Sequence, residues 1–79
     1  MSNVEVKVII YANDRNVAAM VKGLAWEVDG PKSVAGASKK FLAAHGHLVF
    51  HFGSREKADE FVDVLAMYLP GILGRISTS

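Results

Sequence analysis

The chain has 79 residues, a formal net charge of +1 and 51% hydrophobic residues. This length accommodates a single domain, residues 1–79, and leaves no room for a second core. The near-balance of charge disfavours a dedicated DNA-binding protein, which is usually far more basic. Cysteine is absent from the sequence, which excludes disulfides and cysteine-based zinc sites.

The hydropathy pattern gives no sign of a membrane segment or an export signal. Apolar runs are only a few residues long, whereas a helix needs about 20 apolar residues to span a bilayer. The opening residues, MSNVEVKV, lack the basic-then-apolar order of a signal peptide. We therefore expect a cytoplasmic protein without a membrane partner. The mean hydropathy of +0.22 favours some apolar surface that is shared with a partner.

Residues 4–11 alternate with a period of two, which predicts a strand. One face is β-branched throughout and carries Val4, Val6, Val8 and Ile10. The opposite face begins charged, ends apolar and aromatic, and carries Glu5, Lys7, Ile9 and Tyr11.

Two segments in the first half of the chain fit either a helix or a strand. Apolar residues at spacings of three and four predict an amphipathic helix over about 14–28, capped by Asn13 or Asp14. A second strand is the alternative there, because Gly23 disfavours a helix. Residues 32–45 fit a helix that ends at Gly46. Alternatively, residues 39–44 form a strand, and His45-Gly46 is a tight turn into the next strand.

Residues 48–52 predict another strand, with Leu48, Phe50 and Phe52 towards the core. Its opposite face carries His47, Val49 and His51. Ser54 is expected to cap a helix with an apolar stripe from 58 to 69. On the outer side of that helix, Arg55 can pair with Asp59. Pro70-Gly71 stops the helix, residues 72–76 are expected to form a short strand, and residues 77–79 a tail.

These elements predict an α+β fold, a two-layer sandwich in which an antiparallel sheet carries two helices on one face. A ferredoxin-like order, βαββαβ, is expected, and ββαβα is the alternative. The expected core is apolar and draws on the two longer strands and the two longer helices: Val6, Val8, Ile10, Val17, Val21, Leu24, Leu48, Phe50, Phe52, Phe61, Leu65 and Leu69.

Histidines surround the second strand, but their spacing does not predict a metal site. His47 and His51 lie about 13 Å apart if both are on one strand, too far to share a zinc ion. His45 and His47 are closer, yet no further ligand accompanies them. The sequence also lacks a cysteine nucleophile, a GxSxG or HExxH motif and a phosphate-binding loop. We therefore expect a non-enzymatic protein with no metal, no cofactor and no catalytic residue.

Residues 46–61, GHLVFHF followed by a capped helix, resemble the third strand and second helix of an RNA-recognition motif. That family stacks bases on two outward aromatic side chains of the strand. The matching positions here hold His47 and Val49, and valine does not stack. The resemblance implies single-stranded nucleic-acid binding as an alternative function. The candidate residues for it are Tyr11, His47, His51, Lys39 and Lys40.

A different function is expected if the strands at 4–11 and 47–52 are neighbours. The sheet face without helices then carries Ile9, Tyr11, His47, Val49 and His51, flanked by Lys7. An open face with apolar and aromatic side chains is either wet or paired with another protein. We expect this face to bind a protein partner, and to join two copies of the chain in a homodimer.

Two further stretches resemble a known family. They are VDGPKSVAGA at 28–37, and FGS at 52–54 followed after a helix by LPGILGRI at 69–76. In their order and in chain length they are similar to small phage anti-CRISPR proteins that inhibit type I systems. The resemblance implies a compact α+β protein that binds a CRISPR surveillance complex by surface contact and blocks target DNA without catalysis. It implies no particular binding residues.

Overall fold

The computed structural model describes residues 4–11 and 15–78. The elements in chain order are β1 (Val4–Ile9), α1 (Arg15–Asp29), the 3-10 helix η1 (Pro31–Val34), α2 (Lys39–His45), β2 (His47–Phe52), α3 (Arg55–Tyr68), the 3-10 helix η2 (Pro70–Arg75) and β3 (Ile76–Thr78). The predicted α+β class is confirmed. None of the helices in the described part of the chain is long and apolar enough to cross a membrane.

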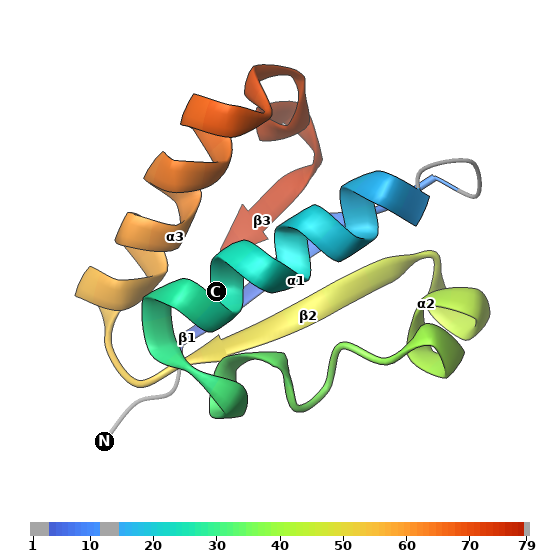
Figure 1. The fold of residues 1–79 in the computed structure, drawn as a ribbon, viewed down its shortest axis with the longest axis horizontal. Helices are drawn as coiled ribbons and strands as arrows, with labels where there is room; N and C mark the ends of the chain where they lie inside the picture. The colour runs from blue at the N-terminus through green and yellow to red at the C-terminus, as the bar shows by residue number, and fades with distance from the viewer. Residues whose placement is uncertain (1–3, 12–14, 79) are drawn as a thin grey trace.

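The strands form one antiparallel sheet in the order β2-β1-β3. β1 lies in the centre, with Val6 opposite Phe50 on one side and Val8 opposite Ile76 on the other. Helices α1 and α3 lie next to each other over one face of this sheet, while η1 and α2 lie beside β2 (Figure 1). The predicted two layers therefore exist, and one of them is an antiparallel sheet.

The number of strands differs from the prediction. Three strands lie within the described residues, whereas βαββαβ requires four, so the ferredoxin-like order is not confirmed. The alternative order ββαβα is not observed either, because a helix follows β1 directly. The connection between α1 and β2 forms η1 and α2 where the ferredoxin-like order has a strand.

The helix predicted over 14–28 is confirmed as α1, and the strand alternative is wrong. Val21 and Ala25 are fully buried one turn apart on the side that meets the core, which outweighs the helix penalty of Gly23. Gly23 itself is exposed. The predicted caps at Asn13 and Asp14 lie outside the described residues.

The segment 32–45 is helical in two pieces, so the alternative strand at 39–44 is wrong as well. The Ser38 hydroxyl accepts a hydrogen bond from the Phe41 N–H at 3.0 Å and caps α2. Gly46 follows α2 with φ +75°, the left-handed conformation expected of glycine at a helix end. Between η1 and α1, the buried Ser33 hydroxyl lies 2.9 Å from the Ala25 carbonyl oxygen and 2.7 Å from that of Gly30.

An acidic side chain joins the end of α1 to the turn before α3. One oxygen of the Asp29 carboxylate accepts a hydrogen bond from the Gly53 N–H at 3.0 Å. The other lies 3.7 Å from the Lys32 ammonium nitrogen. On the far side of that turn, the Ser54 hydroxyl accepts from the Lys57 N–H and caps α3, as predicted.

The core lies between the sheet and helices α1 and α3. The Phe61 ring of α3 packs on Phe50 and Phe52 of β2, with ring centroids 5.2 and 5.0 Å apart. Most of the predicted core is buried, but Val17, Leu24 and Leu69 are only partly buried because they lie at its margin. The buried apolar residues that the prediction omitted are mostly small: Val4, Ala18, Ala25, Ala37, Ala58 and Ile72.

The predicted course of the C-terminal segment is wrong. Residues 70–75 form η2, and the last strand begins only at Ile76. Pro70 has a backbone already suited to a helical turn, and the turn directs Ile72 into the core, where it is 4% exposed. Ser77 and Thr78 belong to β3 and pair with β1, so they are not a tail.

Candidate protein-binding surface

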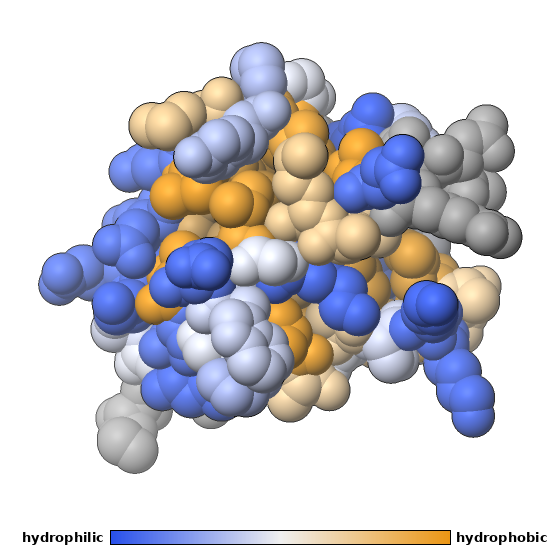
Figure 2. Space-filling view, viewed as in Figure 1, coloured by the Kyte–Doolittle hydropathy of each residue, from blue (hydrophilic) through white to orange (hydrophobic). Residues whose placement is uncertain are grey.

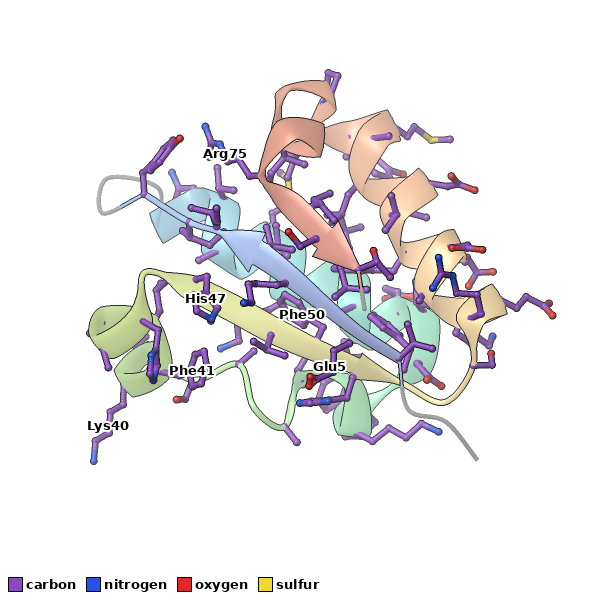
Figure 3. The ribbon with its side chains drawn as sticks, turned by 180° about the vertical axis from the view of Figure 1, so that it is seen from behind. Glu5, Lys40, Phe41, His47, Phe50 and Arg75 are labelled. Atoms are coloured by element: carbon purple, nitrogen blue, oxygen red, sulfur yellow. The ribbon has the colours of Figure 1, made fainter. Side chains whose placement is uncertain are left out.

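The sheet face opposite α1 and α3 carries no helix within the described residues, and Figure 3 looks onto it. Three cross-strand pairs of β1 and β2 lie on this open face: Glu5 with His51, Lys7 with Val49, and Ile9 with His47. Glu5 and His47 therefore lie on it, while the ring of Phe50 belongs to the opposite, buried side. The register brings together four of the five predicted partner-binding residues.

The open face is more exposed along β1 than along β2. Ile9 is 42% exposed, whereas His47, Val49 and His51 are half-buried. The chain between η1 and α2 runs close to β2: a Cβ atom placed on Gly36 would lie 3.5 Å from the His51 Nε2 atom and 3.8 Å from the Val49 carbonyl oxygen. The outer side of β2 is therefore occupied by the protein's own chain.

Tyr11, the fifth predicted partner-binding residue, lies beyond the end of β1. The strand predicted over 4–11 stops at Ile9, because the turn at Gly46 ends the pairing; the last bond runs from the Ile10 N–H to the Gly46 carbonyl at 3.2 Å. The Tyr11 side chain is 57% exposed, and the Arg75 guanidinium carbon lies 4.1 Å from the centroid of its ring. The sequence prediction missed Arg75, since 64 positions separate it from Tyr11.

An aromatic cluster forms where α2 meets β2. The Phe41 ring centroid lies 4.3 Å from that of His45 and 5.4 Å from that of His47, and the two imidazoles are 5.7 Å apart. The His47 Nδ1 atom also lies 3.2 Å from the His45 carbonyl oxygen. Within the described chain, no three histidine, aspartate or glutamate side chains gather in a way that could hold a metal ion.

The residues proposed for nucleic-acid binding are not brought together on one surface. Lys39 and Lys40 are exposed in the first turn of α2, and Figure 3 shows Lys40 directed away from His47 and from the sheet. His51 lies at the other end of β2, opposite Glu5. Tyr11 and His47 are the two candidates at the same end of the sheet.

Four acidic side chains of α3 collect on a separate surface. They line a shallow hollow of about 420 Å³ along one side of α3, formed by Glu56, Asp59, Glu60, Asp63, Val64 and Met67. The predicted pair is present there, with the Arg55 Nε atom 3.5 Å from Asp59 Oδ1. Every residue of this hollow comes from one helix, so it is a strip of helix surface with no opposing wall.

The helix-bearing side exposes large apolar residues that the sequence prediction did not treat as a surface. They are Met20 and Trp26 of α1, and Met67 and Tyr68 of α3. Figure 2 shows apolar surface on this side, broken up by hydrophilic side chains. Trp26 and Met67 lie outside the predicted apolar stripes of their helices, and this signal could have identified them. Met20 and Tyr68 belong to the predicted stripes, so the periodicity gave no sign that they are exposed.

No protein-family model, curated protein or solved structure matches this chain. The surfaces of the chain itself are therefore the basis for a functional proposal.

Proposed function

We propose that the protein is a non-catalytic protein-binding domain, and that the open sheet face is its contact surface. The observation that supports this most directly is the 42% exposure of Ile9 and 57% exposure of Tyr11 at one end of that face. Large apolar and aromatic side chains left in water beside half-buried Val49 favour burial against another protein. The proposal includes a cytoplasmic location, which the absence of cysteine from the sequence favours.

An introduced charge tests the proposal. Ile9→Glu puts a carboxylate on the open face, and Ala19→Glu puts the same residue on an exposed position of α1 as a control. With tagged protein in an extract of its native host, Ile9→Glu should lose the captured partner, while Ala19→Glu should retain it at the wild-type level. Circular dichroism establishes that both variants are folded. Equal capture by the two variants would refute the proposed surface.

We propose that the same face joins two copies of the chain. A chain this short is stabilised by mass action when a second copy covers its apolar surface. Light scattering coupled to size exclusion should give a mass that rises with concentration in the wild type and stays monomeric in Ile9→Glu. A wild-type monomer at every concentration removes the homodimer from the proposal and leaves the other partner untouched.

The narrower proposal is a phage-type inhibitor of a CRISPR surveillance complex. Its support is the resemblance of residues 28–37 and 69–76 to type I anti-CRISPR proteins, together with a surface suited to contact and not to catalysis. The test is a gel-shift assay in which a type I surveillance complex binds its target DNA. Adding the protein should abolish the shifted band, and an unchanged band at saturating protein would exclude this inhibitor.

Single-stranded nucleic-acid binding is the second candidate. The stack of Arg75 on Tyr11 and the ring of His47 favour it, because bases stack on such side chains. Fluorescence anisotropy with a labelled oligothymidine, at low and at moderate salt, separates the two functions. Phosphate attraction is strongest at low salt, so the protein-binding proposal expects no change in anisotropy there.

We also propose that the fold is a ferredoxin-like sandwich in which one strand is replaced. Removing a strand from βαββαβ leaves the observed order of strands and long helices, with η1 and α2 in the place of the missing strand. In that arrangement the uncovered face is the natural contact surface, because both long helices pack on the other face.

A further inference from the structure

The outer side of β3 is one of the two edges of the sheet. In the order β2-β1-β3, β3 pairs with β1 on its inner side. The opposite edge, along β2, is flanked by η1 and α2 (Figure 1). Within the described residues, no strand pairs with the outer side of β3. A strand at the edge of a sheet presents unpaired N–H and C=O groups, and these can pair with another chain.

The register determines which backbone groups of β3 point outward. The Ile10 N–H donates to the Gly46 carbonyl, so the even-numbered residues of β1 bond to β2 and the odd-numbered residues bond to β3. Ser77 lies opposite an odd-numbered residue of β1, so its N–H and C=O point towards β1. The N–H and C=O groups of Ile76 and Thr78 therefore point away from the sheet, to the place of a fourth strand.

The helical layer is wider than the sheet that it covers. Two helices side by side, each about 10 Å in diameter, span about 20 Å. Strands lie about 4.8 Å apart, so this width corresponds to about four strands, whereas the sheet has three. Figures 1 and 3 show α3 beyond β3, on the side away from β1. The helix therefore covers a strip next to β3 that no described strand fills.

The side chains of β3 show the effect of this unfilled strip. Ile76 lies opposite Val8, so both point to the helix-bearing side of the sheet. Val8, in the central strand, is 0% exposed, whereas Ile76 is only half-buried. Thr78, on the same side of β3, is exposed. A strand added beside β3 would cover both residues and would lie under α3.

We infer that the outer edge of β3 receives an extended segment of another protein as a fourth strand. The backbone of the segment bonds to Ile76 and Thr78, and every second side chain points under α3, which favours apolar β-branched or aromatic residues at those positions. A second copy of this chain fits less well, because antiparallel pairing of β3 with β3 would place two α3 helices over the same strip. The inference rests on the proposed function, since it specifies the form in which a protein partner binds.

A proline at position 78 removes one outward donor selectively. The Thr78 N–H does not bond to β1, and proline is tolerated on an edge strand where its missing N–H would face outward. Thr78→Pro should therefore leave the sheet intact. Thr78→Val keeps both the N–H and the branched side chain, and it is the matched control. Urea denaturation should give similar stabilities for the two variants and the wild type.

The experiment selects peptides from a random library displayed on phage, with the full-length protein as bait. The wild type should enrich peptides in which apolar residues alternate with polar ones. A labelled copy of an enriched peptide should bind Thr78→Pro at least about tenfold more weakly, whereas Thr78→Val should bind it as the wild type does. Methylating the backbone nitrogens of the peptide one at a time should weaken binding at alternate positions, because alternate N–H groups face β3.

Several results would overturn the inference. They are no enriched sequence, enriched peptides with helical spacing of their apolar residues, unchanged binding by Thr78→Pro, or equal effects of methylation at successive positions. A homodimer that dissociates in Thr78→Pro, measured by light scattering, would assign the edge to a second copy instead.

The inference and the proposed function can fail separately. If Ile9→Glu loses the natural partner while Thr78→Pro keeps it, the proposed function stands and the inference fails. If only Thr78→Pro loses the partner, the edge of β3 is the contact surface and the open face is not. If both variants keep the partner, both proposals fail.

Discussion

The two faces of the sheet are one residue apart in the sequence and opposite in environment. Val6 and Val8 of β1 are 0% exposed, while Lys7 and Ile9 next to them face solvent. The backbone alternation of a strand produces this contrast, because only one side meets α1 and α3. The comparison teaches that stability is concentrated on one face: residues on the buried face hold the fold together, and we expect those on the open face to change with little cost.

The largest expected effect on stability comes from comparing a buried-face and an open-face substitution on β2. Phe50→Ala removes a fully buried ring in contact with Phe61 and should cost about 3–5 kcal/mol of unfolding free energy. Val49→Ala, one residue away on the open face, should cost under about 1 kcal/mol. Urea denaturation measures both. Similar losses would mean that the open face is as important to stability as the core, and the contrast would collapse.

A pair of glycine variants sharpens the comparison at the entry to β2. Gly46 has φ +75°, so Gly46→Ala should destabilise by about 1–2 kcal/mol. Gly36 has no positive φ, and its added Cβ atom would make ordinary contacts with His51 and Val49. Gly36→Ala should therefore stabilise by about 0.4–1 kcal/mol. Thermal melts should show opposite shifts, and shifts of the same sign would contradict the expected dependence on φ.

The next largest effect on stability is expected from removing a buried hydroxyl, compared with removing an exposed one. Ser33→Ala removes the hydroxyl that bridges α1 to η1 and should cost about 1 kcal/mol. Ser77→Ala changes an exposed residue of β3 and should change stability by less than about 0.5 kcal/mol. The denaturation midpoints of the two variants measure these changes in stability. A shift confined to Ser77→Ala would show that Ser33 does not hold the segment beside β2.

The smallest effect is on the exposed side of α3. Arg55 and Asp59 are about two-thirds exposed, at 66% and 64%. Asp59→Ala should cost only about 0.3–0.5 kcal/mol, and the loss should disappear in high salt. Repeating the urea titration at two salt concentrations tests this. A loss that persists at high salt would indicate a contact other than the ion pair.

Local pattern was enough to predict the strand faces and the start of one helix. The alternation in β1 and β2 assigned each residue to its face, and Ser54 marked the start of α3, because both depend on nearest neighbours along the chain. The place of β3 could not be predicted in this way. A three-residue strand has too little propensity of its own, and only its pairing with β1 defines it.

The part of the candidate surface that lies on the strands was predictable from local alternation. The part that depends on tertiary contacts was not. Periodicity placed Ile9, His47, Val49 and His51 together. The contact between Tyr11 and Arg75 depends on how distant parts of the chain fold back on each other, which no local pattern encodes. The half-burial of His51 depends on Gly36 lying close to it, again a consequence of the tertiary fold.

The pairing of Val6 with Thr78 has a practical consequence. It brings residues 4 and 78 to the same side of the domain, at the end of the sheet remote from Tyr11 and Arg75. A fluorophore, affinity handle or surface tether attached at residue 4 or 78 would therefore lie away from the end of the sheet that carries Tyr11 and Arg75. The same closeness makes a circularly permuted chain feasible.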